Sequence, residues 1–254
     1  MTAVTPDTSL DAIRREIDSI DDQILGLLLQ RFAATERVKA TKAHDGSIAS
    51  SPFRPARETA MMQRLISAAG TSLDPQIVVR LWRVILSASI QSQAPVTLHM
   101  DSVLGHDLAI RLLVSQHFCG MTVDLHQTPA RALAALGKAQ GDLALVAPSS
   151  DWAAGFSAGE AGRAQVIVTL PVLAAGGQPQ LLIFGHAAQQ PSGDDETLVL
   201  IPDDKAKVPD ALWQARSGAV TLAGLPGFHD DVINSISPGA RIAGRYPRPI
   251  KVSP

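Results

Sequence analysis

An unbroken amphipathic stripe runs from Leu10 to Val38, and no other feature constrains the fold as strongly. Its positions recur at alternating spacings of three and four, the period of one helix face. They are Leu10, Ile13, Ile17, Ile20, Ile24, Leu27, Arg31, Ala34 and Val38. Because Gly26 is the only glycine or proline between Leu10 and Asp45, the pattern predicts one helix of about 33 residues, ~50 Å long. That length exceeds what a lone three-helix unit can cover, so the helix should pack along a second copy or span two lobes.

Two shorter helices are predicted after this first one. Pro55 suits a first helical turn, and the segment 56–69 ends at Gly70, a residue that commonly terminates helices. Asp74 followed by Pro75 is a start signal for a third helix that stops before Pro95. Its stripe is Val78, Trp82, Ile85, Ser89 and Gln93. We therefore expect an all-α three-helix domain over residues 1–95.

Composition and charge narrow the possible partners. The chain has 254 residues, 46% hydrophobic and 18% charged, and its formal net charge of −2 would gather neither nucleic acid nor an anionic membrane. The single cysteine, Cys119, excludes an internal disulfide, and no apolar run is long enough to span a membrane. The N-terminus has no apolar core flanked by positive charge, so we expect no secretion signal and a cytoplasmic protein.

Polar residues interrupt the apolar stripes, and buried polar groups are costly unless they are paired. Arg31 occupies a core-like position, and Lys42 follows eleven residues later, about 20° away around the helix and ~16 Å along it. The two cations could bracket a small anion. Glu58, Ser89 and Gln93 also lie on apolar faces, where a ligand would supply partners. Taken singly, each of these residues also fits a solvated side chain.

Four segments together resemble one family of helical enzymes across this domain. They are LDAIRREIDSIDDQILGLLLQR, KATK, FRPARE and LWRVILSASIQSQ. In order and spacing they are similar to the AroQ class of chorismate mutases. The resemblance implies an intertwined helical dimer that rearranges chorismate to prephenate without metal or organic cofactor.

The resemblance also implies catalytic roles for four residues. Lys42 and Gln93 would donate to the ether oxygen whose bond breaks. Arg31 would bind a substrate carboxylate, and Glu58 would accept from the ring hydroxyl. These roles suit a pericyclic reaction, because negative charge grows on the ether oxygen and the reacting groups must be held together.

Three further residues are implied in substrate binding. Arg14 would bind a carboxylate, Ser89 would lie against a carboxylate, and Arg57 would be the basic residue beside the site. The family often has an acid where this sequence has Arg54, in a loop longer than usual by three residues. Arg54 would either assist substrate binding or merely face solvent, and the second role is favoured.

The distance between Arg14 and Lys42 predicts the quaternary structure. Twenty-eight residues of helix span roughly 42 Å, more than chorismate can bridge, so both residues cannot serve one site within one chain. If both act, Arg14 reaches into the partner's site. We therefore expect a homodimer with two composite sites.

The remainder alternates strand-like and helix-like segments, which predicts an α/β region. Residues 96–188 faintly resemble part of prephenate dehydratase, and residues 189–254 resemble an ACT-type regulatory unit or a structural tail. The dehydratase signature Thr-Arg-Phe is missing, so we expect no dehydratase chemistry. Within the tail, the segment 208–215 (VPDALWQA) is expected to be helical and the segment 194–196 to be a solvated loop.

Three functions stay open at this point: a mutase with a structural tail, a bifunctional or amino-acid-regulated mutase, and a non-catalytic small-ligand sensor. The first is favoured because the domain has the residues that the chemistry requires. No metal site is expected, since His117 with Cys119 is too sparse for zinc.

Overall fold

The computed structural model divides into two compact units, Met1–Ile48 and Ala49–Pro254. The described residues are 9–44, 51–136, 141–174, 176–203, 205–230 and 236–251, and the side chains of 42–44 lie outside the description. The three predicted helices are distributed over both units, with one in the first and two in the second.

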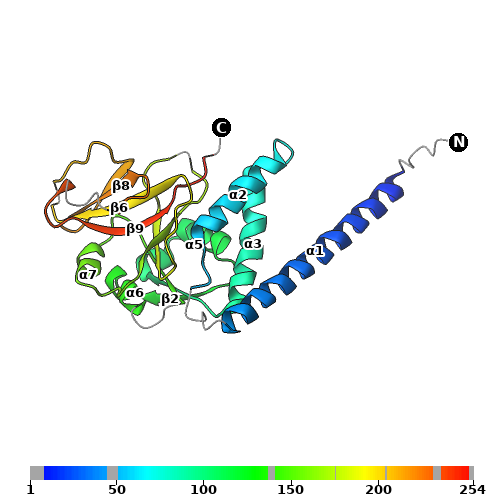
Figure 1. Cartoon of the computed structure of the whole chain (residues 1–254), viewed down its shortest axis with the longest axis horizontal. Helices are drawn as coiled ribbons and strands as arrows, with labels where there is room; N and C mark the ends of the chain where they lie inside the picture. Colours follow the sequence, from blue (N-terminus) through cyan, green and yellow to red (C-terminus); the bar gives the residue numbers. More distant parts are fainter. Residues whose placement is uncertain are drawn as a thin grey trace. The chain divides into compact units, whose positions relative to one another are not determined.

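The described part of the first unit, residues 9–44, forms one helix, α1 (Leu10–His44), which runs without a break for 35 residues (Figure 1). Ser9 precedes it, and the Ser9 Oγ accepts a hydrogen bond from the backbone N of Ala12 at 3.2 Å. The prediction of one long helix is confirmed. Its apolar stripe is exposed, with Ile17 and Ile24 at 52% and 50%.

The second unit begins with a helical hairpin made of α2 (Pro55–Ala69) and α3 (Pro75–Gln93). Pro55 opens α2, and Gly70 follows it with a φ of 56°, a conformation that side-chain-bearing residues rarely adopt. Asp74 caps α3 by accepting from the backbone N of Gln76 at 2.6 Å. Both predicted helices and their start and stop signals are confirmed. No helix in the described part of the chain is long and apolar enough to cross a membrane.

Within the described residues, nine strands form one mixed sheet in the order β2-β1-β3-β5-β4-β9-β6-β8-β7. Their bounds are β1 Thr97–Asp101, β2 Thr122–His126, β3 Leu143–Val146, β4 Gln165–Leu170, β5 Leu181–Gly185, β6 Asp195–Ile201, β7 Trp213–Ser217, β8 Val220–Pro226 and β9 Arg241–Pro247. β1 pairs in parallel with β2 and β3, β4 pairs in parallel with β9, and the other pairs are antiparallel. The predicted α/β region is thus confirmed.

Short helices accompany the sheet, among them α4 (Ser102–His106), α5 (Leu108–His117), α6 (Pro129–Ala135) and α7 (Ala153–Ser157). Alternate residues of the strands feed two apolar clusters on opposite faces. Leu143 and Leu145 of β3 join one cluster with α5, whereas Ala144 and Val146 join the other with α6 and α7. The sheet therefore has a core on each face.

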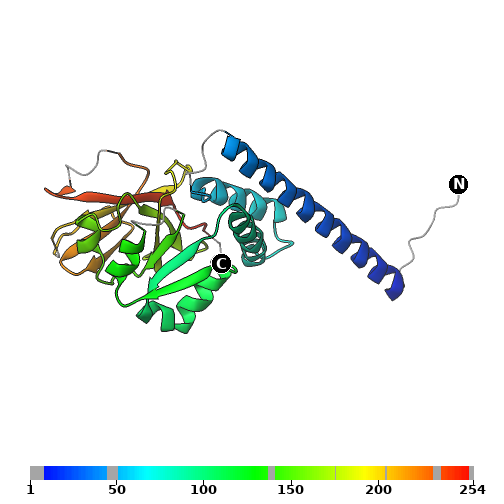
Figure 2. The same cartoon turned by 90° about the horizontal axis from the view of Figure 1, so that it is seen from below.

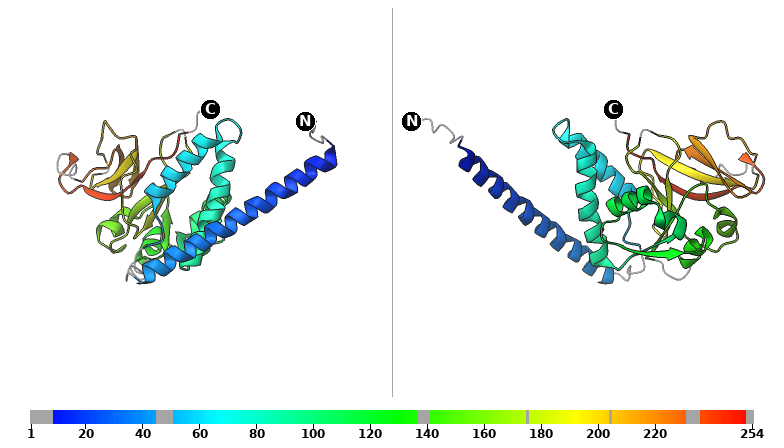
Figure 3. Two further views of the ribbon diagram at one scale, coloured as in Figure 1. Left: turned by 45° about the vertical axis from the view of Figure 1, so that its right-hand side comes forward. Right: turned by 180° about the vertical axis from the view of Figure 1, so that it is seen from behind.

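The helical hairpin packs against this α/β region (Figures 2 and 3). α3 contacts α5, and α2 contacts β9. Phe53 and Ile90 belong to the same apolar cluster as Phe118, Leu143 and Ile167. The hairpin and the sheet consequently share a core.

Two expectations for the C-terminal part are wrong. The segment 208–215 is not helical, because its second half enters β7, where Trp213 is buried and pairs with Gly224 of β8. Within the segment 194–196, only Asp194 is exposed. Glu196 is 4% exposed and accepts hydrogen bonds from Trp213 Nε1 at 2.5 Å and from the Tyr246 hydroxyl, while burial raises its pKa.

The domain boundaries drawn at 95/96 and 188/189 stay predictions. The sheet contains strands from both sides of 188/189, since β5 lies within 96–188 and β6 to β9 lie within 189–254. The boundary between the two compact units instead falls between residues 48 and 49, before α2.

Candidate active site

Three of the cations predicted for the site, Arg14, Arg31 and Lys42, lie along α1. Arg14 is largely exposed and forms an ion pair with Asp11, 3.3 Å from Nη1 to Oδ1. Arg31 is half-buried, and burial lowers its pKa, yet a guanidinium stays charged near neutral pH. Lys42 lies on the same unbroken helix, with a side chain outside the described residues. The helical register puts Arg31 and Lys42 on one face, ~16 Å apart along the axis.

Glu58 lies in the first turn of α2 and faces Arg83 of α3. Its Oε2 accepts from Arg83 Nη1 at 2.8 Å, and its Oε1 accepts from the backbone N of Arg54 at 3.2 Å. The side chains of Arg83 and Glu58 are only 8% and 12% exposed, so the two charges form a nearly buried ion pair. Among the described residues, the Nε of Arg83 has no hydrogen-bond partner.

Ser89 and Gln93 lie one turn apart on α3. The Ser89 Oγ donates to the carbonyl of Ile85 at 2.8 Å, and the Gln93 Nε2 donates to the carbonyl of Ser89 at 2.9 Å. At about 100° per residue, Ser89 and Gln93 lie about 120° and 80° around the helix from Arg83. The structure thus brings Ser89 and Gln93 together on a face of α3 other than the face of the Glu58–Arg83 pair.

The two remaining cations lie at the start of α2, with Arg54 in the preceding loop and Arg57 in the helix. Arg54 is half-buried and folds back onto its own loop, where its Nη1 donates to the carbonyls of Ser51 at 2.6 Å and Phe53 at 2.9 Å. The reading in which Arg54 merely faces solvent is therefore wrong. Arg57 is exposed on the first turn of α2, where a ligand can reach it.

A cavity of about 20 Å³ adjoins the ion pair, lined in part by Glu58, Arg83, Ser87 and His117. It has room for about one water molecule. The Ser87 Oγ donates to the carbonyl of His117 at 3.3 Å, which links α3 to α5. Burial, together with the nearby charge of Arg83, lowers the pKa of His117 well below its ordinary value, so its ring is neutral near pH 7. This small cavity therefore lies within a packed contact between the hairpin and α5.

Arg83 is the residue that sequence reasoning missed. It belongs to a second stripe of α3 with spacings of four, four and three, formed by Val79, Arg83, Ser87 and Ile90, all of which are buried. A cation in such a stripe requires an acidic partner. The sequence analysis considered only the first stripe, which ends on Ser89 and Gln93, and therefore missed the second.

The helical part of the chain is similar to a known protein family. Residues 13–94 match the family model described as chorismate mutase type II. A bifunctional chorismate mutase/prephenate dehydratase from Pseudomonas aeruginosa is 30% identical over 88 residues, which are 34% of this chain and 24% of that protein. The match thus spans about a quarter of the length of that relative. No solved structure matches the chain.

The family match begins inside α1 and extends to the residue that follows α3. It contains every residue proposed for the site from the sequence. Residues 13–94 therefore form a chorismate mutase type II domain, followed in the same chain by an α/β region with a nine-stranded sheet.

Proposed function

We propose that the chain is a chorismate mutase, an isomerase that rearranges chorismate to prephenate in aromatic amino acid biosynthesis. The match of residues 13–94 to the chorismate mutase type II family model carries this proposal. The relative from Pseudomonas aeruginosa is named for the same activity. A cytoplasmic location and independence of metals and organic cofactors are parts of the same proposal.

The proposed mechanism is charge stabilisation combined with conformational trapping. Lys42 and Gln93 donate to the ether oxygen as negative charge grows on it, and Arg31 holds a carboxylate so that the reacting carbons meet. Glu58 accepts from the ring hydroxyl. Although Arg83 and the backbone of Arg54 already occupy part of its carboxylate, a carboxylate has about four lone-pair sites.

The remaining residues of the proposed site bind substrate without touching the breaking bond. Arg57 and Ser89 would contact the substrate from α2 and α3. Arg14 would come from a second chain, because ~42 Å of unbroken helix separates it from Lys42.

A homodimer is therefore part of the proposal, and the surface of α1 supports it. Nine large apolar side chains on this helix are exposed in the single chain: Leu10, Ile13, Ile17, Ile20, Ile24, Leu25, Leu27, Leu29 and Val38. Apolar surface of this extent on one helix favours association. A second copy of α1 has the complementary stripe by symmetry.

Substitution of Lys42 tests the proposed chemistry. Removing one preorganised donor at a developing oxyanion costs about 10²- to 10³-fold in kcat in other enzymes, so Lys42→Ala should lose at least ~100-fold. Lys39→Ala, on an exposed position of the same helix, is the matched control and should keep its activity. Near-normal turnover by Lys42→Ala, followed as chorismate loss, would remove Lys42 from the mechanism.

Mixing two inactive variants tests the composite site. Arg14→Ala and Lys42→Ala chains, unfolded together and refolded, should form heterodimers in which one of the two sites is intact. Activity should therefore reappear on mixing. If the mixture stays as inactive as each parent while mass measurement finds heterodimers, Arg14 does not cross between chains.

Measurements with chorismate and with prephenate separate the proposed function from the two alternatives. A regulated mutase would change its rate with phenylalanine or tyrosine, a bifunctional enzyme would convert prephenate to phenylpyruvate, and a sensor would bind chorismate without turnover. We expect chorismate turnover alone, with no phenylpyruvate above the uncatalysed rate.

A further inference from the structure

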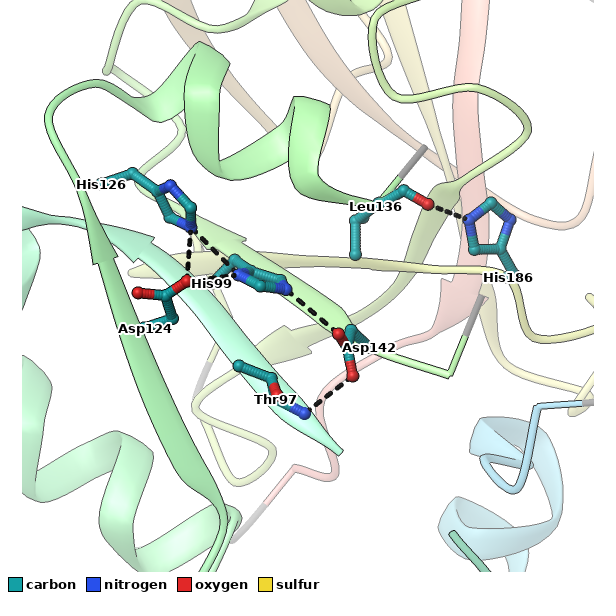
Figure 4. Close-up of polar contacts among 7 residues, drawn as sticks. All are labelled: Thr97, His99, Asp124, His126, Leu136, Asp142 and His186. Carbon is teal, nitrogen blue, oxygen red and sulfur yellow. Dashed lines mark hydrogen bonds and ion pairs between the residues drawn. The ribbon is translucent and has the colours of Figure 1, made fainter. Parts of the chain in front are cut away.

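A cluster of two histidines and one aspartate lies at the end of the sheet farthest from β7. His99 is on β1, and Asp124 and His126 are on the edge strand β2. The parallel register pairs His99 with Asp124, and residues two apart on a strand lie on the same face. All three side chains therefore gather on one face of two neighbouring strands, as Figure 4 shows.

Three potential ligand atoms converge in this cluster. His99 Nδ1 lies 3.0 Å from His126 Nε2 and 3.7 Å from Asp124 Oδ2, and the last two atoms are 3.6 Å apart. The point equidistant from all three in their plane lies about 2.0 Å from each, so an ion displaced slightly from this plane would have bonds of about 2.0–2.2 Å, the lengths of zinc bonds to nitrogen and oxygen. The spacing thus fits one face of a coordination tetrahedron.

The other ring nitrogen of His99 has the partner that metal-ligating histidines ordinarily have. His99 Nε2 lies 3.2 Å from Asp142 Oδ2, and Asp142 is itself held by the backbone N of Thr97, which donates to its Oδ1 at 2.8 Å. Because a carboxylate only accepts, Nε2 is the protonated nitrogen and Nδ1 presents a lone pair to the cluster. A carboxylate behind a ligating imidazole fixes its orientation and raises its basicity.

When both rings are neutral, the cluster has more acceptors than donors. His99 Nδ1 and Asp124 Oδ2 then both face His126 Nε2, where a single proton can serve only one of them at a time. A divalent cation would satisfy all three atoms together. His99 is 7% exposed, whereas the side chains of His126 and Asp124 are 20% and 57% exposed. The fourth coordination position therefore opens toward solvent.

We propose that His99, His126 and Asp124 bind one divalent transition-metal ion, Zn²⁺ being the ion that suits the donor set, with Asp142 orienting His99 from behind. Two imidazoles and one carboxylate with a free position form the arrangement of zinc sites that exchange a water or a substrate. The site is independent of the proposed mutase reaction, which uses no metal. It also reverses the sequence-based expectation that the chain has no metal site.

The test is zinc binding by the full chain, produced without a histidine tag and stripped of metal with a chelator. Zn²⁺ is titrated against a chromophoric chelator, and Co²⁺ is added separately to read ligand geometry from its visible absorption. We expect one Zn²⁺ per chain at micromolar protein, and a Co²⁺ spectrum typical of four or five ligands including nitrogen. Absence of saturable binding at these concentrations would overturn the proposal.

Matched variants assign the binding to the cluster. His126→Ala and Asp124→Ala change partly or largely exposed side chains on an edge strand, so circular dichroism should report an intact fold. Asp142→Asn should weaken binding about 10- to 100-fold, and each ligand variant should weaken it more. His106→Ala, which removes an exposed histidine of α4, should bind as the wild type does. Unchanged affinity in either ligand variant, or an equal loss in His106→Ala, would overturn the site.

Discussion

The ion pair between Glu58 and Arg83 joins α2 to α3, next to the contact between the helical hairpin and the α/β region. Arg83 lies on the face of α3 that also carries Ser87, which donates to the carbonyl of His117 on α5. A residue predicted to contact substrate is thus held by a partner at the contact with the α/β region. Arg83 therefore holds the Glu58 carboxylate in position, whichever ligand Glu58 binds.

Removing Arg83 should therefore destabilise the fold. Breaking a buried pair by deleting one partner typically costs about 3–5 kcal/mol, because the other charge is left uncompensated, and we expect this loss for Arg83→Met in urea unfolding. Arg83→Met combined with Glu58→Gln should recover part of it. Arg80→Met, exposed on the same helix, should stay within about 0.5 kcal/mol of wild type. An Arg83→Met chain as stable as the control would contradict this account.

His117 should make the protein sensitive to mild acid. The pKa of His117 is lowered in the folded chain. Below about pH 6.5, His117 therefore becomes protonated in the unfolded chain while it stays neutral in the folded chain. The free energy of unfolding should fall as pH drops from about 6.5 to 5, by up to ~1.4 kcal/mol per unit. Denaturant unfolding across this range should show the slope in wild type and His106→Ala but not in His117→Gln. An equal slope in His117→Gln would assign it to other groups.

At the residue scale, the sequence allowed us to predict the candidate site residues that match a family pattern. It did not allow us to predict the residues that only the fold brings together. Ser89 and Gln93 are predictable from one helix alone. The cluster around His99 requires the parallel register of β1 and β2, which brings residues 25 positions apart into line. A signal was present, since Asp124 and His126 alternate on a strand-like segment, but their partner could not be chosen without the pairing.

Among the elements, α1 has the most direct consequence for assembly. Ile17→Asp with Ile24→Asp would put two charges into its exposed apolar stripe, so we expect a monomer without mutase activity. Ser19→Asp, on the opposite face of the same helix, should keep both the dimer and the activity. Sedimentation velocity at two concentrations, paired with the chorismate assay, measures the two properties. A wild-type chain that stays monomeric, or a doubly substituted chain that stays dimeric, would refute this interface.

The helices of the first 95 residues were predictable because caps, breakers and period agree locally. The segment 208–215 misled the sequence analysis because Val208, Leu212 and Ala215 are spaced like a helix face. Two long-range interactions override that local pattern, the pairing of β7 with β8 and the hydrogen bond from Trp213 to Glu196. The same hydrogen bond, together with the pairing of β6, buries the acidic segment that was expected to be a loop.

Considered as a whole, the molecule does not separate cleanly at residue 95. Phe53 and Ile90 of the helical part lie in one apolar cluster with Phe118, Leu143 and Ile167. The boundary in the sequence follows the family pattern, whereas the core follows burial. Composition alone could not reveal that the second part of the chain completes the core of the first.

A truncated chain of residues 1–95 should consequently be less stable than the full chain. It would expose Phe53 and Ile90, which are 5% and 6% exposed in the whole chain, and it would leave Arg83 and Glu58 open to water. We expect a lower thermal midpoint of the helical signal and stronger binding of a hydrophobic dye. If residues 1–95 melt at the midpoint of the full chain with no dye binding, the shared core contributes no stability to the helices.

The position of β2 links the proposed metal to how well the protein stays in solution. β2 is the first strand of the sheet, and within the described residues no strand pairs with its outer side. Such an edge can recruit an edge from another molecule, and Val123 and Leu125, 43% and 45% exposed, offer it apolar surface. An ion held by His99 of β1 and by two residues of β2 would clamp this strand to its neighbour and place charge on the open edge. Removal of the ion by a chelator would then favour aggregation through the unpaired edge of β2, without any change in helices α1, α2 and α3.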